Sequence, residues 1–395
     1  MILRFAWIPV LAMLSCSQKE NDREGTYQHD VAFLKKHNRT VVELSSGKAR
    51  VLISGDYQGR VMTSSSNGEE GTGYGWINYD LIASGKKLKQ FNPVGGEERF
   101  WLGPEGGQYS LYFAPGDSFL IKNWQVPALL DTTSFNLESH STSSATFTKS
   151  ASLTNYSGGA FDLNITRTLS LIDQQQLSTL GVSITNNISW VAYQSENIIE
   201  NSGDNTWTKE SGLLSVWLLG MFTPSSATTV IIPFKPIPQA QEFITSNYFG
   251  EIPADRLTIQ DSTLFFICDG KHRSKIGLAP DIAKPIAASF DFEKNILTLV
   301  IFNVQPEASY VNSTWTIQSN PFQGDVVNAY NDGPLADGSQ LGPFYELESS
   351  SPALALNPGQ AETYKQITLH AQGDFDALNH VAQKTLGIDL RQLKK

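Results

Sequence analysis

Cysteine is scarce in this sequence, with only two in 395 residues. Cys16 lies near the N-terminus, and Cys268 ends the apolar run Leu264–Cys268. No framework of disulfides is possible, so the fold must depend on its hydrophobic core, for which this length is sufficient. We expect Cys268 to be a buried, inert thiol and not a nucleophile.

Charge is also sparse, because Asp, Glu, Lys and Arg make up only 17% of the chain. The chain has 29 basic and 39 acidic residues, which gives a net charge of -10, and its basic residues form no concentrated patch in the sequence. Nucleic acid is therefore excluded as an expected partner. Uncharged polar residues are abundant and aromatics reach 11%, a mixture typical of secreted β proteins and of proteins that bind sugars.

The N-terminus indicates export and lipid anchoring. A basic start, Met1–Arg4, precedes the apolar stretch Phe5–Leu14, which has the length of a signal-peptide core and is too short to cross a bilayer. It ends in Met-Leu-Ser-Cys, which resembles a bacterial lipobox. We therefore expect a signal peptide at residues 1–15, lipidation of Cys16, and a tether at residues 16–27. The protein would then sit at the bacterial cell envelope, held to the membrane through its lipid anchor only.

The rest of the chain predicts an all-β protein. Short apolar and alternating segments recur between turns rich in Gly, Pro, Asn and Ser, without the long helices of an α/β protein. We expect one domain at residues 28–395, an antiparallel sandwich, with a C-terminal helix beginning after Asp374. The expected strands include Tyr109–Phe113, Leu177–Asn186 and Trp315–Gln318. A monomer is the default expectation.

Several common catalytic signatures are missing. The sequence has no HExxH motif, no His/Cys cluster with zinc spacing and no nucleophile elbow, and its Gly-rich loop at Gly68–Gly75 lacks the Lys-Ser/Thr of a P-loop. The oxygen-rich loop Asn331–Gly338 could coordinate calcium, although it lacks EF-hand spacing. We therefore expect no cofactor, with calcium as the one alternative.

The stretch Gly324–Pro352 contains the strongest candidate site. Its strand, Phe344–Glu348, places Glu346 and Glu348 on the same face. Two neighbouring carboxylates are costly to bury without partners, so this face is either open to water or lines a polar cleft. Asn328 and Asp332 precede the strand and are candidate ligand-binding residues.

Three further clusters of residues are candidate parts of a binding site. In Gly95–Gly107, the alternation predicts that Glu97, Arg99 and Trp101 share one face, and Glu105 follows in a tight turn. An Arg beside a carboxylate and an indole is suited to holding a polar ring, although a structural ion pair is the alternative.

The second cluster is Ser195–Glu210, which we interpret as a polar loop at the rim of the sandwich that offers Glu196, Asn197 and Lys209. The third, Cys268–Lys275, is the densest basic cluster and offers Lys271, His272 and Arg273 to an anion or to the carboxylates. In both cases a solvated surface segment is the alternative.

These segments together resemble the galactose mutarotase-like superfamily, and more closely an uncharacterised family of bacterial lipoproteins within it. The resemblance is carried by Asp-Tyr-Gln-Gly-Arg after the first hairpins, by GGEERFW and GPEGG, by the mid-chain Glu-Asn segment, and by Tyr-Glu-Leu-Glu-Ser-Ser-Ser-Pro. It covers nearly all of the chain after the tether. It implies a large β-supersandwich with a sugar site on its concave face.

The resemblance also implies roles for individual residues. The late catalytic Glu of mutarotases falls on Glu346 or Glu348, and their substrate-binding Arg falls on Arg99. Their mid-chain His has no counterpart, since no histidine occurs between His140 and His272, so the acid role would pass to Lys209, Lys271 or His272. We therefore expect a carbohydrate-active protein of epimerase, glycosidase or lyase type, or alternatively a surface lipoprotein that only binds sugar.

Overall fold

A computed structural model describes residues 24–185 and 187–394. The predicted signal peptide, Cys16 and most of the tether lie outside the described residues. Within the described part, no helix is long and apolar enough to cross a membrane.

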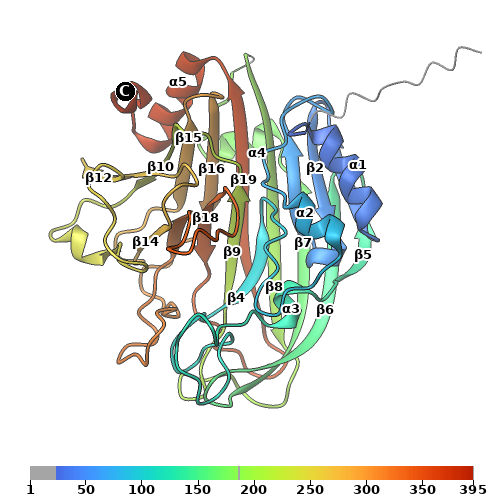
Figure 1. The fold of residues 1–395 in the computed structure, drawn as a ribbon, viewed down its shortest axis with the longest axis vertical. Helices are drawn as coiled ribbons and strands as arrows, with labels where there is room; N and C mark the ends of the chain where they lie inside the picture. Colours follow the sequence, from blue (N-terminus) through green and yellow to red (C-terminus); the bar gives the residue numbers. More distant parts are fainter. Residues whose placement is uncertain (1–23, 186, 395) are drawn as a thin grey trace, which may run out of the picture.

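The chain forms three antiparallel sheets, as Figure 1 shows. The largest has ten strands in the order β12 (Leu257–Gln260), β13 (Thr263–Ile267), β10 (Thr228–Pro233), β15 (Ile286–Asp291), β16 (Ile296–Phe302), β19 (Ala361–Gly373), β8 (Ile188–Asn201), β7 (Ala160–Leu171), β6 (Ser144–Thr154) and β5 (Asn136–His140). The second has six strands in the order β11 (Ile244–Thr245), β14 (Ser274–Leu278), β17 (Val327–Asn331), β18 (Tyr345–Ser350), β9 (Ser215–Phe222) and β4 (Arg99–Gly103). A third sheet joins β1 (Val41–Ser46), β2 (Ala49–Ser54) and β3 (Arg60–Ser65). The predicted all-β supersandwich is confirmed.

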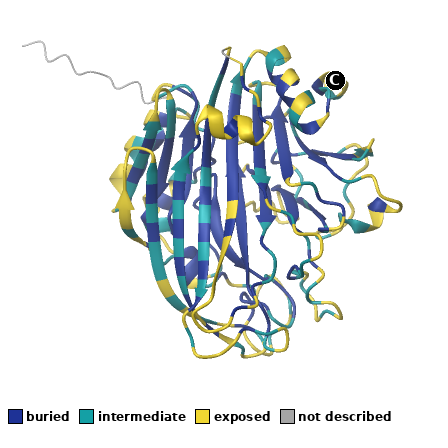
Figure 2. Cartoon of the chain, turned by 180° about the vertical axis from the view of Figure 1, so that it is seen from behind, coloured by how far each residue is buried: buried dark blue, intermediate teal, exposed yellow. Residues whose placement is uncertain are grey.

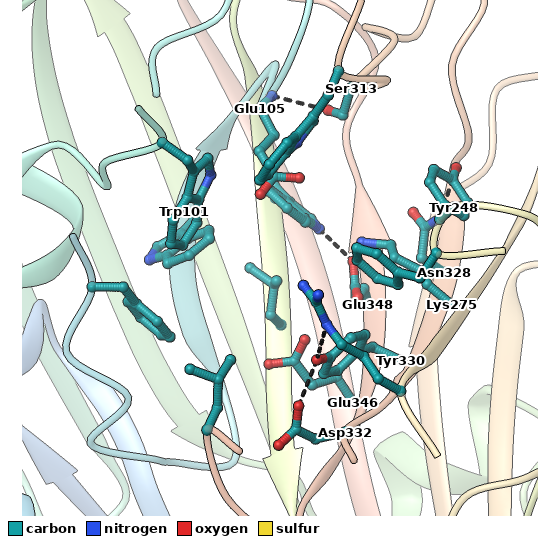
Figure 3. A pocket seen from close by; sticks show the side chains of 18 of the residues that line it. Trp101, Glu105, Tyr248, Lys275, Ser313, Asn328, Tyr330, Asp332, Glu346 and Glu348 are labelled. Atoms are coloured by element: carbon teal, nitrogen blue, oxygen red, sulfur yellow. Dashed lines mark hydrogen bonds and ion pairs between the residues drawn. The ribbon is translucent and has the colours of Figure 1, made fainter. Parts of the chain in front are cut away.

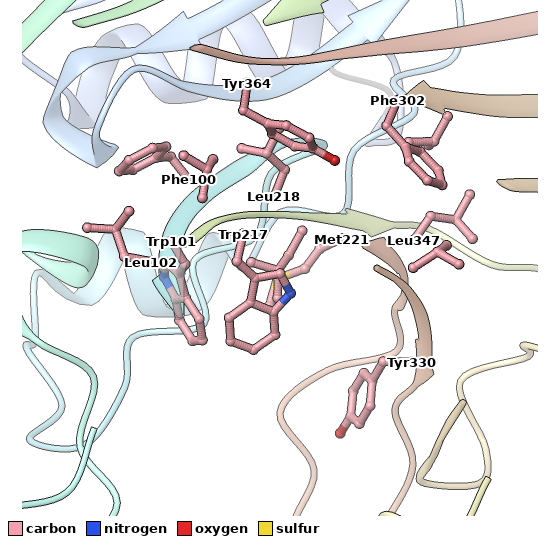
Figure 4. Close-up of a cluster of buried hydrophobic side chains, with 14 of the residues drawn as sticks. Phe100, Trp101, Leu102, Trp217, Leu218, Met221, Phe302, Tyr330, Leu347 and Tyr364 are labelled. Atoms are coloured by element: carbon pink, nitrogen blue, oxygen red, sulfur yellow. The ribbon is translucent and has the colours of Figure 1, made fainter. Parts of the chain in front are cut away.

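The main hydrophobic core fills the space between the two larger sheets. The long strands β6, β7 and β8 alternate buried and part-exposed side chains, which is the pattern of a sheet with one covered face (Figure 2). In the six-stranded sheet, Phe100 and Leu218 point to one side, whereas Trp101 and Trp217 point to the other (Figure 4). This sheet therefore has a core-facing side and a second side that carries the site described below.

A buried polar layer crosses the core beside β4. The Glu98 carboxylate pairs with the Arg167 guanidinium at 2.6 Å, and both side chains are fully buried. The Glu97 carboxylate lies 3.0 Å from Nε2 of His370 and accepts a hydrogen bond of 2.8 Å from the Ser64 hydroxyl. Glu97 thus points into the core and does not share the face of Arg99 and Trp101 that its spacing predicted, because it precedes the regular part of the strand.

Five α-helices and three short 3-10 helices lie outside the sheets in the described residues. The α-helices are α1 (Tyr27–His37), α2 (Tyr79–Ser84), α3 (Ala128–Asp131), α4 (Gln174–Thr179) and α5 (Phe375–Leu386), and the 3-10 helices are η1 (Gly55–Tyr57), η2 (Ala240–Phe243) and η3 (Leu390–Leu393). Asp374 caps α5 by accepting from the backbone amides of Asp376 and Ala377, as the sequence predicted. The apolar side of α5 packs on the outer face of the ten-stranded sheet, where Leu378 and Val381 are buried.

Four local predictions were wrong. Tyr109–Phe113 and Trp315–Gln318 form no strand, and Leu177 lies in α4, whose N-terminus is closed by a capping box between the N-cap Asp173 and Gln176. The segment predicted as a rim loop from Ser195 instead continues strand β8 as far as Asn201. Its Ser, Glu and Asn residues resemble a loop in composition, but they alternate with buried positions in the middle of a sheet.

Candidate functional site

The outer face of the six-stranded sheet forms the floor of a cavity of about 1170 Å³. Cross-strand register determines which side chains reach it. Glu348 lies opposite Asn328 on β17 and Leu219 on β9, and Arg99 on β4 lies opposite Leu219 on its other side. Because alternate residues share a face, these strands present one continuous row of side chains to the cavity. Loops that include residues 88–93, 121–124, 247–249, 311–315 and 333–341 form its walls.

Each of the two late glutamates is paired with a cation. Nη2 of Arg99 lies 2.9 Å from Oε1 of Glu346, and Nζ of Lys275 lies 2.8 Å from Oε2 of Glu348. The indole of Trp217 also donates to Oε2 of Glu348, at 2.9 Å. Both glutamates are almost fully buried, so these partners compensate for the loss of solvation.

Burial changes the acidity of the cavity carboxyls. It raises the pKa of Glu346 to about 7; Arg99 opposes the shift and the nearby charge of Glu348 adds to it. Burial likewise raises the pKa values of Glu105, Asp325 and Asp332. For Lys275, burial lowers the pKa, but the attraction of Glu348 and Glu105 outweighs it, so the pKa is raised and the amine stays protonated.

Some buried polar atoms at the cavity have no protein partner. They include Nε and Nη1 of Arg99 and Oε1 of Glu348, in side chains that are at most 2% exposed. A buried unsatisfied donor or acceptor is destabilising by roughly 1–3 kcal/mol, more for a charged group, so such atoms indicate a site where a ligand supplies the missing partner.

Aromatic rings form much of the wall. The guanidinium carbon of Arg99 lies 4.1 Å from the centre of the Trp101 ring, whose indole donates to the carbonyl of Leu130 at 3.1 Å. The Trp101 and Trp217 rings meet edge to face at 5.5 Å. Further along the cavity, the rings of Trp124 and Trp315 stack with their centres 6.1 Å apart. Burial raises the pKa of Glu105, and hydrogen bonds from these two indoles oppose part of that shift.

A second cluster of polar side chains lies beside strands β14 and β17. The Tyr248 hydroxyl donates to Asp325, and the amide of Asn328 donates to the same Oδ2 atom of Asp325 at 3.3 Å. The Tyr330 hydroxyl donates to Asp332 at 2.6 Å and accepts from Nε of Arg273 at 3.2 Å. These bonds fix the side chains at one end of the cavity (Figure 3).

The cavity brings together eight of the site residues that the sequence predicted. They are Arg99, Trp101, Glu105, Arg273, Asn328, Asp332, Glu346 and Glu348, which come from positions up to about 250 residues apart in the chain. Alternation along each strand determines which residues face the cavity. The pairing of neighbouring strands, which spacing along the chain does not reveal, then brings these residues together.

The other four predicted residues do not line the cavity. Lys271 is exposed in the turn before β14, and Lys209 is exposed beside the Phe322 ring. Glu196 and Asn197 lie on β8 in the other sheet, where Glu196 pairs with Lys365 and Asn197 is buried against Arg167. They are absent from the cavity because the segment that carries them is a strand of the ten-stranded sheet and not a rim loop.

Several residues that line the cavity were not predicted from the sequence, namely Trp124, Trp217, Tyr248, Lys275, Trp315 and Tyr330. Lys275 belonged to the basic cluster that was noticed, and its spacing of two from Arg273 would have placed both on one strand face. The aromatic residues carry no such signal, because a large ring, in a strand or in a loop, is more often packed in the core than used to line a site.

Among the described residues, no group of three or more His, Cys, Asp or Glu side chains is arranged to hold a metal ion. The calcium expectation for Asn331–Gly338 therefore gains no support from the described geometry.

Three solved structures illustrate what this fold is similar to. A putative aldose 1-epimerase from Escherichia coli K12 has 12% identity, covers 85% of this chain and 99% of its own, and gives a TM-score of 0.49. The Slr1438 protein from Synechocystis sp. PCC 6803 has 12% identity, coverages of 85% and 97%, and a TM-score of 0.50. A galactose mutarotase-like protein from Lactobacillus casei ATCC 334 has 12% identity, coverages of 84% and 100%, and a TM-score of 0.48. At these identities the likeness concerns the fold alone.

No curated protein matches the sequence significantly. The profile of one protein family does match it, over residues 25–395, which is nearly the whole chain and includes every residue of the cavity. The chain therefore belongs to DUF6786, a family of unknown function.

Proposed function

We propose that the cavity binds a carbohydrate and that Glu346 performs acid–base chemistry on it. One observation carries the proposal: Glu346 is buried at the floor of the cavity, held by Arg99, with its pKa raised to about 7. Proton transfer by a side chain is most effective when its pKa lies near the working pH, so this carboxyl is suited both to accept and to return a proton.

The polar atoms of the floor match a sugar hydroxyl. A hydroxyl both donates and accepts, so it can accept from the free N–H groups of Arg99 and donate to the free Oε1 of Glu348. The rings of Trp101 and Trp217 offer an apolar surface for the C–H face of a sugar. The combination supports a polyhydroxylated ring better than a purely apolar or purely ionic ligand.

The reaction that this arrangement best supports is interconversion of the anomers of an aldose. Glu346 would take the proton of the anomeric hydroxyl while the bond between C1 and the ring oxygen breaks, and a protonated group would deliver a proton to that ring oxygen. Lys275 and Glu105 are the candidate donors at the cavity, since burial favours the protonated form of Glu105 and ion pairing that of Lys275. Reclosure from the other face of the carbonyl returns both protons.

The test is a panel of reducing monosaccharides, with binding measured by calorimetry and anomer exchange by NMR. Wild type should bind at least one sugar and accelerate exchange, and Glu346→Gln should bind it but lose about 10²–10⁴-fold in rate. Glu138→Gln, an exposed glutamate on β5, is the matched control and should behave as wild type. Failure of the folded wild type to bind any sugar or glycoside would reject the proposal.

A second candidate is sugar binding without turnover. It is favoured by one observation: no histidine is among the described residues that line the cavity, whereas the mutarotases that the sequence resembles use one as the acid. Binding that is equal in wild type and Glu346→Gln, with anomer exchange at the uncatalysed rate in both, would select this candidate.

We also propose that the protein is exported and anchored through a lipidated Cys16 at the bacterial cell envelope. The support is the lipobox-like sequence before Cys16 and its short apolar stretch. Wild type expressed in a bacterium should fractionate with membranes, and Cys16→Ser should not. Equal membrane association of both forms would contradict lipid anchoring.

A further inference from the structure

The mouth of the cavity is unusually apolar. Nine large hydrophobic side chains are exposed in the described chain, and five of them line this one cavity: Leu88, Ile121, Phe249, Leu335 and Leu341. Exposed apolar side chains scattered singly are normal, but a concentration around one opening marks an interaction site.

The five residues form two walls. Leu88 and Ile121 lie on loops that are joined by Gln90, whose side-chain amide donates to the carbonyl of Trp124 at 3.0 Å and also to that of Ile121. Phe249, Leu335 and Leu341 lie on the loops beside β14 and β17, where the Arg273 guanidinium stacks 4.0 Å from the centre of the Phe249 ring. Between and below these walls is the polar floor with Glu346 and Glu348.

The volume indicates a ligand larger than one sugar. Pockets that enclose a drug-sized molecule measure roughly 300–1,000 Å³, and this cavity measures about 1170 Å³. A single ring on the floor would leave the apolar walls in contact with water. A ligand that fits both the polar floor and the apolar walls is amphipathic, with its polar ring at the carboxylates and an apolar group at the mouth.

We infer that the natural ligand is a reducing sugar that carries an apolar substituent away from its anomeric carbon, such as an O-acylated or O-alkylated aldose, and that the two walls hold this substituent. The inference rests on the proposed carbohydrate site, because the walls are continuous with its floor and a ligand seated on the floor must pass between them. Each methylene group moved from water to such a wall contributes roughly 0.8 kcal/mol, so chain length becomes a quantitative probe.

The experiment compares the 6-O-methyl and 6-O-octyl ethers of glucose, galactose and mannose, whose anomeric hydroxyl stays free, by calorimetry, with octyl compounds kept below their micelle concentration. For the sugar that binds, the octyl ether should bind at least ten-fold more tightly than the methyl ether. Leu335→Ser combined with Leu341→Ser should remove most of this preference and leave methyl ether binding unchanged. Leu180→Ser is the matched control, since Leu180 has a similar exposure, 41% against 42% for Leu341, and lies outside the cavity.

Three results would overturn the inference. Equal affinity for methyl and octyl ethers would reject it and leave the sugar site intact. Equal binding of an octyl detergent without a sugar, or binding to sugar-free phosphatidylglycerol vesicles that is lost in the Leu335/Leu341 variant, would assign the walls to a lipid surface instead. Absence of binding for every free sugar and every ether would reject the proposed function together with the inference.

Discussion

At the scale of single residues, the site is defined by buried charges that are only partly compensated. Glu346 and Glu348 each have a cation within 3 Å, yet Arg99 keeps two nitrogen atoms and Glu348 one oxygen without a partner. A protein selected for stability alone would satisfy or replace such groups, because each is costly in an interior of low dielectric constant. The incomplete pairing therefore supports a ligand-binding role.

The raised pKa of Glu346 predicts how stability depends on pH. Its folded-state pKa is about 7 against 4.5 for the ordinary carboxyl, so the folded protein holds this proton more tightly than the unfolded chain. The contribution to stability is complete below about pH 4.5 and is lost as the pH rises to about 7. Relative to Glu346→Gln, wild type should lose roughly 3 kcal/mol across this window in urea unfolding. A constant difference between the two proteins from pH 4.5 to 8 would contradict the shifted pKa, and Glu138→Gln serves as the control.

Two lysines of one segment offer a second comparison. Lys275 pairs with Glu348 at the cavity, whereas Lys271 is exposed outside it. Lys275→Met should weaken sugar binding at least ten-fold, because Glu348 loses its cation and its preferred orientation. Lys271→Met should bind as wild type. Calorimetry with circular dichroism as a check on folding makes the comparison, and the reverse order of effects would restore Lys271 as the site residue.

At the scale of elements, the cavity depends on a close approach of two side chains to the backbone of β14. Gly277 on β14 lies opposite Asn328, and a Cβ atom at Gly277 would overlap the side chains of both Asp325 and Asn328. The absence of a side chain at this position therefore allows the group of Tyr248, Asp325 and Asn328 to form.

Gly277→Ala should displace Asp325 and Asn328 and reduce both stability and sugar binding. We expect a loss of roughly 1–3 kcal/mol, as for other overpacked sites, measured by urea unfolding. Gly203→Ala is the control, since the nearest atom to its added Cβ would be a side-chain atom 3.2 Å away. Unchanged binding in a folded Gly277→Ala protein would remove Asn328 from the set of ligand-orienting residues.

At the scale of the whole molecule, two large sheets are joined by an apolar core that contains fully buried ions. Arg167 on β7 in the ten-stranded sheet pairs with Glu98 at the start of β4, and Glu97 contacts His370 on β19. These contacts link the sheet that carries the cavity to the sheet behind it. They fix the position of β4, and with it that of Arg99.

Arg167→Met should therefore be severely destabilising. Removing one member of a buried pair leaves the other charge uncompensated, which lowers the free energy of unfolding by roughly 3–5 kcal/mol. Adding Glu98→Gln should recover a large part of this loss, as a double-mutant cycle would show. Arg391→Met, which breaks an exposed pair with Asp389, should change stability little. Additive effects of Arg167→Met and Glu98→Gln would contradict the pairing.

Sequence patterns alone predict the fold class, the C-terminal helix after Asp374, and the shared face of Glu346 and Glu348. These features follow from local chemistry, namely turn residues, alternation along a strand and helix capping. Strand order and register bring Arg99 to Glu346, bring Lys275 and not Lys271 to Glu348, and place Glu196 and Asn197 in another sheet. Those outcomes depend on strand order and register between segments up to about 250 residues apart, which local patterns along the chain do not encode.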